Sequence, residues 1–451
     1  MTLSPHILLI NPWIHDFAAY DFWAKPLGLL ILAGILRQHG FKISYIDCLD
    51  RFHPNAASVA MHARNGRGPY LKTKIPNPDG LEDIQRTYSR YGIPPEWFCE
   101  DLKALARPDL ILVTSLMTYW YPGVQETIKT IKKVFPNIPV VLGGIYATLC
   151  HDHAVLHSGA DQVIAGPGIE SILDLAAAYT GYSPLPAYDP GNLDTVAFPA
   201  LDLQHEINYA PLLTSRGCPF SCTYCASNIL DPKRMQRSPA SVVKEILHWH
   251  KNYNVIDFAF YDDALLINAG THIIPILENL IRIGLKVRFH TPNAVHIREI
   301  TQQTAGLMFA AGFKTIRMGL ETTAFDKRND LDNKVSAHEF NRAITCLKQA
   351  GFSQNQIGAY LLIGLPDQDP AAIEASIKVV KQAGITPVLA HYSPIPHTQL
   401  WRHAVASSRY DLESDPIFTN NALFPCHRET FSWKALTRLK QLTEKTKLNN
   451  K

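Results

Sequence analysis

The sequence predicts an α/β protein in which two parallel-sheet domains are followed by a short helical part. Two observations predict this fold class. Short apolar runs alternate with segments of helical spacing along most of the 451 residues, which is the pattern of repeated strand–helix units. A proline-rich stretch at residues 181–211 interrupts the alternation and indicates a linker. We therefore predict domains at residues 1–180 and 212–400, with a helical extension at residues 401–451.

The first domain is predicted to be a doubly wound parallel sheet. Its expected strands are residues 6–11, 42–46, 110–114, 140–142 and 161–164, and its expected helices are residues 26–39, 124–135 and 170–179. The strands are short apolar runs that end in turn signals, as buried parallel strands do. Gly40 follows the first helix, where a C-cap glycine is expected. Ligands of such sheets bind beyond the carboxyl ends of the strands.

An insertion at residues 49–108 separates the second expected strand from the third. It carries Arg64, Arg67, Arg86, Arg90 and Trp97. A segment of this length inside a compact domain is usually functional or mobile. Two interpretations stay open: a solvated covering segment, or a lid that places arginine and aromatic side chains over a bound ligand.

Three loops follow strand ends of the first domain and carry small or polar residues. They contain Ser115, Met117 and Thr118, then Gly143 and Gly144, then Gly166, Gly168 and Glu170. Glycines there let the backbone approach a ligand closely, and a helix that starts in the last loop offers its N-terminus to an anion. Turn chemistry alone also explains each loop when it is taken singly.

The second domain is predicted to be a partial (β/α)6 barrel of the TIM type. Its expected strands are residues 212–215, 256–261, 287–290, 315–319, 356–363 and 388–392, and its expected helices are residues 239–251, 271–283, 297–311, 336–350 and 370–383. Gly284, Gly312, Gly351 and Gly384 stand at helix exits, where a left-handed residue is favoured. A further helix is expected at residues 432–448 in the extension.

Polar residues follow the strands of this expected barrel, where the reactive groups of barrels lie. The set is Asp262, Asp263, Asn293 and Glu321, together with the backbone stretch Ile363 and Gly364. An acidic residue at one strand end is as often a helix cap as a ligand group. Their common rim makes a binding site the stronger interpretation.

The same rim carries three cysteines, Cys218, Cys222 and Cys225, in the run Arg-Gly-Cys-Pro-Phe-Ser-Cys-Thr-Tyr-Cys. Thiolate is the metal-binding form of cysteine, and packing does not require three of them on one loop. A four-iron cluster normally takes four cysteines, so three would leave one iron open to another ligand. The other five cysteines are scattered, which is not a disulfide framework and favours a reducing cytoplasm.

Composition and spacing make several other classes less favoured. A net charge of +3 does not indicate nucleic acid as the main partner. No apolar run approaches the roughly 20 residues that a membrane span needs. A zinc site would need a fourth ligand, for which His205 and Asp231 are the nearest candidates. A Cys-x-x-Cys redox pair would leave Cys218 unexplained, and a non-enzymatic nucleotide or cobalamin sensor would explain the first domain only.

The spacing of Cys218, Cys222 and Cys225, with Tyr224 before the third cysteine, resembles the radical S-adenosylmethionine (SAM) superfamily. The resemblance implies that the three cysteines hold a [4Fe-4S] cluster whose open iron binds SAM. It implies further roles in SAM binding, with Asp262 and Asp263 at the methionine amine, Asn293 on the same rim, Glu321 at the ribose hydroxyls, and Tyr224, Ile363 and Gly364 beside the adenine. A Gly-Gly-Glu run is commoner in the family where Asp262 and Asp263 stand.

The loop order of the first domain resembles a cobalamin-binding domain, and the whole chain therefore resembles the cobalamin-binding branch of the superfamily. The resemblance implies that the loops with Ser115, Gly143 and Gly166 cradle cobalamin. Members that ligate cobalt through histidine carry Asp-x-His-x-x-Gly after the first strand, and no His-x-x-Gly follows here. We therefore expect cobalamin without a histidine ligand and regard His15 as a loop histidine.

The resemblance implies an enzyme that cleaves SAM reductively to a 5′-deoxyadenosyl radical. The expected reaction is cobalamin-dependent methylation of an unactivated carbon in a small-molecule or lipid-like substrate. The alternatives are a radical ring formation or rearrangement without methyl transfer, and a non-enzymatic cobalamin-binding, nucleotide-binding or zinc-binding protein. A low-potential electron donor such as a flavodoxin or ferredoxin is also implied.

Overall fold

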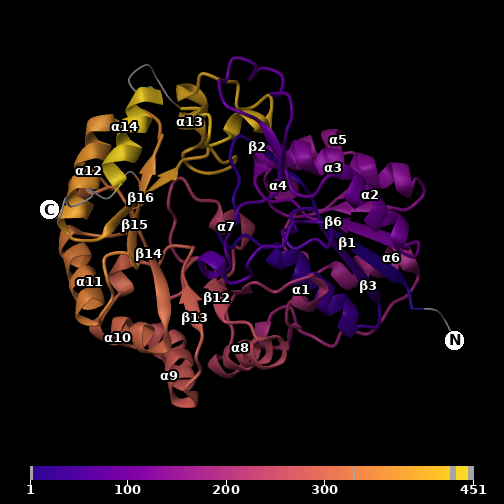
Figure 1. Cartoon of the computed structure of the whole chain (residues 1–451), viewed down its shortest axis with the longest axis horizontal. Helices are drawn as coiled ribbons and strands as arrows, with labels where there is room; N and C mark the ends of the chain where they lie inside the picture. The colour runs from indigo at the N-terminus through magenta and orange to yellow at the C-terminus, as the bar shows by residue number, and fades with distance from the viewer. Residues whose placement is uncertain (1–3, 329–330, 333, 427–432, 445–451) are drawn as a thin grey trace. The chain divides into compact units, whose positions relative to one another are not determined.

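The protein is seen in a computed structural model that describes residues 4–328, 331–332, 334–426 and 433–444. The chain folds into two units (Figure 1). Unit 1 extends to Pro211 and also includes residues 415–417, and unit 2 comprises the chain from Leu212 onward apart from that short segment.

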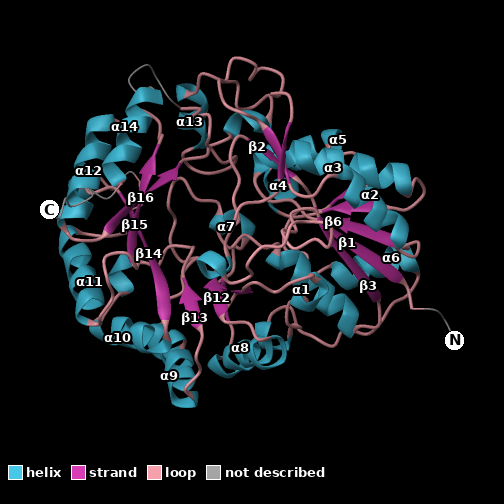
Figure 2. Ribbon diagram, viewed as in Figure 1, coloured by secondary structure: helices cyan, strands magenta, loops and turns pink. Residues whose placement is uncertain are grey.

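Unit 1 is built on a five-stranded parallel sheet in the order β3-β1-β6-β7-β8 (Figure 2). Its strands are β1 (His6–Asn11), β3 (Lys42–Asp47), β6 (Leu110–Val113), β7 (Val140–Leu142) and β8 (Gln162–Val163). The chain order reverses between β1 and β6, so the predicted doubly wound sheet is confirmed. β1 is buried along its whole length, which explains its continuous apolar sequence.

Helices cover both faces of this sheet. They are α1 (Leu27–Gln38), α2 (Pro95–Ala104), α3 (Tyr121–Val134), α4 (Ile145–Leu149), α5 (His151–His157) and α6 (Ile172–Thr180). One apolar core joins Leu8 and Ile10 of β1 to Val124 and Ile128 of α3 and to Phe98 of α2. Because these side chains leave no room for solvent, they fix the sheet and hold the carboxyl ends of its strands in place.

The insertion at residues 49–108 is more ordered than a solvated cover. Its strands β4 (Lys72–Lys74) and β5 (Ser89–Tyr91) join β2 (Ile14–Asp16) in an antiparallel sheet. Phe98 and Leu102 of α2 are completely buried in the core of unit 1. The interpretation as a solvated covering segment is therefore wrong for α2, because that helix supplies core side chains. The lid stays a prediction.

Unit 2 is built on a six-stranded sheet in the order β16-β15-β14-β13-β12-β9 (Figure 2). Its strands are β9 (Ala210–Leu212), β12 (Asp257–Phe260), β13 (Arg288–His290), β14 (Phe313–Glu321), β15 (Ile357–Ile363) and β16 (Thr386–His391). The strands from β12 to β16 are parallel and follow the chain order, as repeated β/α units require. Two short strands, β10 (Ser215–Arg216) and β11 (Met235–Gln236), form a separate antiparallel pair.

The first barrel strand lies earlier in the chain than the sequence suggests. It ends at Leu212, so the expected strand at residues 212–215 is wrong beyond its first residue. The reason is that the following residues are used elsewhere, since Thr214 bonds to the carboxylate of Asp262 and Ser215 pairs with Gln236 in the short hairpin.

The helices of unit 2 follow the predicted alternation. They are α7 (Ser227–Leu230), α8 (Pro239–Tyr253), α9 (Ile273–Ile283), α10 (Gln302–Ala311), α11 (Ala337–Gln349), α12 (Pro370–Gln382), α13 (Trp401–Ser407) and α14 (Trp433–Thr443). The four expected exit glycines all have positive φ: Gly284, Gly312, Gly351 and Gly384. The helix expected from residue 297 begins later because the Thr301 side chain caps α10 by accepting a hydrogen bond from the Thr304 amide.

Short 3-10 turns complete the description: η1 (Ala63–Gly66), η2 (Thr118–Trp120), η3 (Leu193–Thr195), η4 (Leu201–Leu203), η5 (Ala269–Thr271), η6 (Ile297–Glu299), η7 (Phe325–Lys327) and η8 (Pro416–Thr419). Residues 432 and 445–448 of the expected C-terminal helix lie outside the described residues. Among the helices of the described ranges, none combines the length and apolar character needed to traverse a bilayer.

Candidate functional site

The cysteine loop of unit 2 leaves β10 and is fixed by its neighbours. Gly217 has a φ of 74°, and a Cβ there would lie 2.7 Å from the Lys233 carbonyl oxygen, so only glycine fits. The Arg234 guanidinium donates to the Gly217 carbonyl at 3.0 Å. Arg216 pairs with Asp231 across the loop. These contacts set the path of the backbone on which the cysteines stand.

The three thiols occupy different environments on this loop. Cys222 is 7% exposed, Cys218 is partly buried and Cys225 is exposed. Burial raises the pKa of the Cys218 and Cys222 thiols. The Ser227 amide donates to Cys225 Sγ at 3.5 Å. Hydrogen bonds to cysteine sulfur are one of the means by which a protein sets the potential of an iron–sulfur cluster.

Lys334 lies among the candidate site residues of unit 2, although nothing in the sequence singled it out. The Lys334 ammonium donates to the Tyr224 hydroxyl at 3.3 Å and lies beside Cys222. Burial disfavours its charge, but Cys222 and Glu321 hold the pKa of Lys334 above its ordinary value. No motif marks Lys334, which lies 110 residues from Tyr224 in the chain.

Glu321 faces the same lysine from the end of β14. The strand register shifts between Gly319 and Glu321, and Glu321 has a φ of 61°. Such irregularities redirect a side chain relative to the strand. Burial raises the pKa of the Glu321 carboxyl, while Lys334 lowers it. The structure thus brings Tyr224, Glu321 and Cys222 together around Lys334.

A buried arginine holds the loop that follows Glu321. The Arg328 guanidinium donates to the carbonyls of Leu320 and Thr322 and forms a two-pronged pair with the Asp332 carboxylate at 2.8 Å. Its side chain is 2% exposed. Because the two carbonyls flank Glu321, this contact fixes the backbone on both sides of the candidate ribose ligand.

The neighbouring residues Asp262 and Asp263 have different roles. Asp262 is 2% exposed, and its carboxylate accepts hydrogen bonds from the Thr214 amide, the Thr214 hydroxyl and the Ser215 hydroxyl. Asp263 is exposed and borders Ser227 and Cys218. Asp262 therefore ties β12 to the chain before the cysteine loop, whereas Asp263 is the carboxylate available to a ligand.

This difference predicts opposite effects of two adjacent substitutions. We expect Asp262→Ala to lower the free energy of unfolding by about 3 kcal/mol, because it leaves the buried Thr214 amide and Ser215 hydroxyl without their acceptor. We expect Asp263→Ala to change stability by less than about 0.5 kcal/mol and to weaken SAM binding instead. Urea unfolding of the full chain and SAM titration check both values. Equal destabilisation by the two variants would contradict the assignment.

The remaining SAM candidates lie on the same strand ends. The Asn293 amide donates to the Tyr261 carbonyl at 2.6 Å, and its side chain is exposed. Ile363 is buried, and Gly364 has a φ of 85° and donates its amide to the Gln368 side chain at 2.7 Å. The Gly364 amide, which was expected beside adenine, is thus bonded to Gln368. The carbonyl groups of this stretch remain for contact with adenine.

A second missed residue is His296, which lies 3.9 Å from Cys218 Sγ and packs on Phe220. Burial, together with the nearby Lys334 ammonium, lowers the pKa of His296 to about 3. Its position in the loop after β13 offered no signal in the sequence.

The donor set fits an iron–sulfur cluster better than a single metal ion. Within the described ranges, no group of three or more Cys, His, Asp or Glu side chains converges on one point as a mononuclear site requires. Each cysteine of a [4Fe-4S] cluster binds a different iron, so its thiols need only share one loop. The candidate fourth zinc ligands are paired elsewhere, His205 with Asp50 and Asp231 with Arg216.

In unit 1, the loops after β6 and β7 interlock. The Ser115 hydroxyl donates to the Gly143 carbonyl at 2.7 Å. Gly144 has a φ of 98°, and a Cβ there would lie 2.3 Å from the Ser115 carbonyl oxygen. A side chain at residue 144 would therefore separate the two loops. Because β6 and β7 are adjacent in the sheet, these loops form one continuous edge.

The other cobalamin candidates extend this edge. Met117 is 46% exposed, Thr118 is buried, and Glu170 is exposed. Gly166 follows β8 and donates its amide to the Thr148 hydroxyl at 3.0 Å, while Gly168 borders the Leu32 side chain. Three adjacent strands thus present their candidate loops at their carboxyl ends, as ligand sites of such sheets require.

His15 lies on β2 rather than in an open loop. Its side chain is 9% exposed, and its Nε2 lies 2.8 Å from the Glu126 carboxylate, which also pairs with Arg90. This pairing accounts for the histidine without a cobalt atom.

Sequence profiles of two known domains match the chain. The radical SAM superfamily matches residues 212–380, and the B12-binding domain matches residues 84–176. This chain carries a radical SAM domain and a B12-binding domain. Its cofactors are a [4Fe-4S] cluster, SAM and cobalamin.

Curated relatives of this radical SAM enzyme include methyltransferases and a cyclase. An uncharacterized methyltransferase of Pyrococcus horikoshii is 25% identical over 67% of this chain and 70% of its own. The cytidylyl-2-hydroxyethylphosphonate methyltransferase of Streptomyces wedmorensis is 22% identical over 90% of this chain and 83% of its own. The anaerobic magnesium-protoporphyrin IX monomethyl ester cyclase of Cereibacter sphaeroides is 25% identical over 68% and 55%.

Among solved structures, the radical SAM methyltransferase TsrM of Kitasatospora setae, with cobalamin and a [4Fe-4S] cluster bound, has a TM-score of 0.64. It is 16% identical, over 90% of this chain and 76% of its own. The similarity confirms the fold, with a Rossmann-like B12-binding domain followed by a radical SAM domain.

Proposed function

We propose that this enzyme methylates an unactivated carbon of a small-molecule or lipid-like substrate. One observation carries the proposal: a single chain unites a B12-binding domain with a radical SAM domain. B12-binding domains bind cobalamin, which carries a methyl group. Radical SAM domains bind the cluster and the SAM that together generate a carbon radical. Two relatives named as methyltransferases support the same reaction.

The residues of unit 2 would hold and orient the radical-forming cofactors. When bound, the cluster supplies the electron that splits SAM into methionine and a 5′-deoxyadenosyl radical, and cobalamin supplies the methyl group. Cys218, Cys222 and Cys225 would bind the cluster. Asp263 would accept the methionine ammonium of SAM, and Glu321 would accept its ribose hydroxyls. The buried strands around them would exclude water from a radical that attacks solvent.

The edge formed by the Ser115, Gly143 and Gly166 loops would hold cobalamin in unit 1. His15 has its imidazole paired to Glu126 and would therefore not ligate cobalt. We propose binding without a histidine ligand, which is the state expected from the loop sequence.

The test uses SAM with a deuterated methyl group and enzyme reconstituted without oxygen with iron, sulfide and cobalamin. With dithionite as reductant, we expect S-adenosylhomocysteine and deuteromethyl-cobalamin in equal amounts, because each transfer breaks one sulfur–methyl bond and forms one cobalt–methyl bond. We also expect 5′-deoxyadenosine from a second molecule of SAM. Mass spectrometry of the three products checks the result.

Enzyme reconstituted without cobalamin is the control, and it should form no S-adenosylhomocysteine. Formation of 5′-deoxyadenosine without any S-adenosylhomocysteine in the complete mixture would overturn the proposal. That outcome would favour the second candidate function, a radical ring formation or rearrangement without methyl transfer. The similarity to a cyclase over 68% of this chain supports that candidate.

The reaction also needs one electron of low potential for each SAM that is split. We propose a flavodoxin or ferredoxin as its source, because these are small carriers in the required range.

A further inference from the structure

Unit 1 contains a cavity that lies apart from the residues assigned to cobalamin. Its volume is about 250 Å³, and none of the eight residues assigned to cobalamin lines it. Its wall comes from the ends of β1 and β3, the segment at residues 49–53, the chain at residues 203–209, and part of α2. These elements all belong to unit 1. The cavity therefore lies toward β3, whereas the candidate cobalamin loops follow β6, β7 and β8.

One carboxylate in the wall of this cavity accepts hydrogen bonds from two donors on the same oxygen. Asp47 ends β3 and stands opposite Asn11 of β1. The Asn11 side-chain amide donates to Asp47 Oδ1 at 2.7 Å, and the Leu49 amide donates to the same oxygen at 2.9 Å. Neither donor uses Asp47 Oδ2, and the Tyr45 hydroxyl, which also lines the cavity, lies beside this carboxylate. Burial, with the nearby Asp50 carboxylate, raises the pKa of Asp47 to about 6, so it is mainly ionised at neutral pH.

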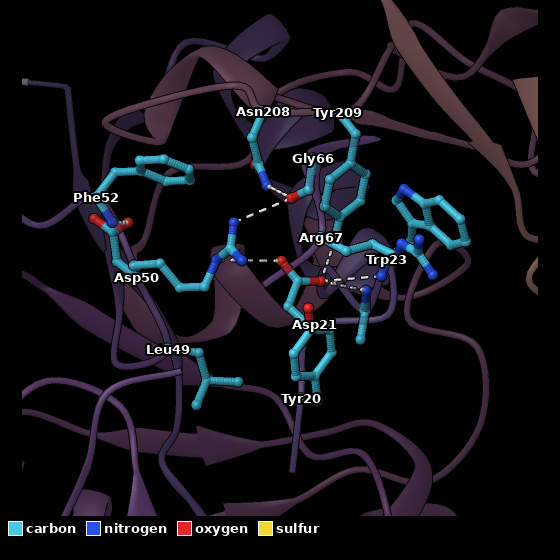
Figure 3. A network of polar contacts seen from close by, with 12 residues as sticks. Tyr20, Asp21, Trp23, Leu49, Asp50, Phe52, Gly66, Arg67, Asn208 and Tyr209 are labelled. Carbon is cyan, nitrogen blue, oxygen red and sulfur yellow. Dashed lines mark hydrogen bonds and ion pairs between the residues drawn. The ribbon is translucent and has the colours of Figure 1, made fainter. Parts of the chain in front are cut away.

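A second polar group in the wall has no protein partner for its acceptor. Asn208 is 2% exposed, and its amide nitrogen donates to the Gly66 carbonyl at 2.5 Å (Figure 3). Its side-chain oxygen is buried without a hydrogen-bond partner among the described residues. Buried amide oxygens are almost always satisfied, so this atom calls for a donor from water or from a ligand in the cavity.

The rest of the wall is fixed and amphipathic. Asp21 accepts hydrogen bonds from the amides of Trp23 and Ala24 and from the Tyr209 hydroxyl (Figure 3). The Arg51 guanidinium donates to the Gly66 carbonyl and lies 3.7 Å from Asp21. The charges of Asp21 and Arg51 neutralise each other. These two side chains therefore define the shape of the cavity and do not attract a charged ligand.

The contents of the wall exclude several ligand classes. Asp47 and Asp50 oppose a phosphate or carboxylate. The ammonium of Lys25 opposes an organic cation. No group of described side chains in the wall converges as a metal site requires. A neutral ligand with several hydroxyl groups suits the acceptor atoms of Asp47 and Asn208.

We propose that this cavity binds a vicinal diol of ribosyl type, with its two hydroxyls on Asp47 and Asn208. Doubly wound sheets that bind nucleotides place an acidic residue at the end of the second strand, where it accepts hydrogen bonds from ribose hydroxyls. Asp47 has that position in unit 1. The loop after β1, Asn11-Pro12-Trp13, lacks the glycine-rich turn that holds a pyrophosphate. A dinucleotide is therefore excluded, and the volume suits a single sugar.

The test compares D-ribose with 2-deoxy-D-ribose on the full-length protein by saturation-transfer NMR and calorimetry. We expect ribose to bind at least about tenfold more tightly, because the deoxy sugar leaves a buried acceptor unpaired. This comparison uses only the wild-type chain. Equal affinity for the two sugars, or no saturable binding of ribose, would overturn the proposal.

Variants then locate the binding. Asp47→Asn keeps the shape of the side chain and should weaken ribose binding by at least about tenfold. Asp152→Asn removes an exposed carboxylate in the same unit and should leave binding unchanged. Glu321→Gln, which alters the ribose ligand assigned to SAM in unit 2, should also leave it unchanged. Ribose binding that survives in Asp47→Asn but is lost in Glu321→Gln would place the sugar in the radical SAM domain and refute the cavity.

Discussion

Replacement of Cys222 by alanine is expected to remove the cluster and with it all SAM cleavage. Cys222 is the most buried of the three thiols, and Cys218 and Cys225 alone offer two ligands. A cluster with three cysteines already has one open iron, and a second open iron leaves it bound too weakly to survive purification. Iron should fall from about four atoms per chain to less than about one.

Iron and acid-labile sulfide assays on anaerobically reconstituted protein measure this loss, and mass spectrometry measures 5′-deoxyadenosine. Cys99→Ala is the matched control, since Cys99 is a free, partly buried cysteine in α2. It should keep wild-type iron. A Cys222→Ala protein that keeps four irons and still cleaves SAM would show that the loop is not the cluster site.

Replacement of Arg328 by methionine is expected to destabilise unit 2 by about 3–5 kcal/mol, because it leaves the buried Asp332 carboxylate without its partner. The substitution also removes the hydrogen-bond donor of the Leu320 and Thr322 carbonyl groups. The backbone around Glu321 then loses its support, so SAM affinity should fall in protein that remains folded. Urea unfolding and SAM titration measure the two effects separately.

The double variant Arg328→Met with Asp332→Leu is the control. It removes both charges and should recover a large part of the lost stability, because a buried ion pair is often replaced by apolar residues at little cost. SAM affinity should not recover, since the two carbonyls stay unsupported. Recovery of both properties would show that the arginine matters for stability alone.

The alternation of elements could be predicted from the sequence because it depends on local chemistry. A buried parallel strand such as β1 needs a continuous apolar run, and each helix from α8 to α12 is followed closely by a residue of positive φ. Short-range signals of this kind also located the cysteine loop. The end of β9 was misplaced because Thr214 bonds to Asp262, which lies 48 residues away in the chain.

The candidate site could be predicted only in part, because its centre is assembled from distant segments. Asp262 and Asp263 are identical in type and adjacent, and only the structure shows that Thr214 and Ser215 occupy the first of them. Lys334 carries no motif, and its role follows from its contact with Tyr224. The cavity beside Asp47 depends on Asn208, whose partner Gly66 lies 142 residues earlier.

The backbone at Glu321 carries a cost that folding alone would avoid. A residue other than glycine at a φ of 61° is less stable by roughly 1 kcal/mol, and glycine would relieve that strain. Glu321→Gly should therefore stabilise the folded chain while it removes the carboxylate. The strained backbone at residue 321 is thus the cost of holding a carboxylate at the end of β14.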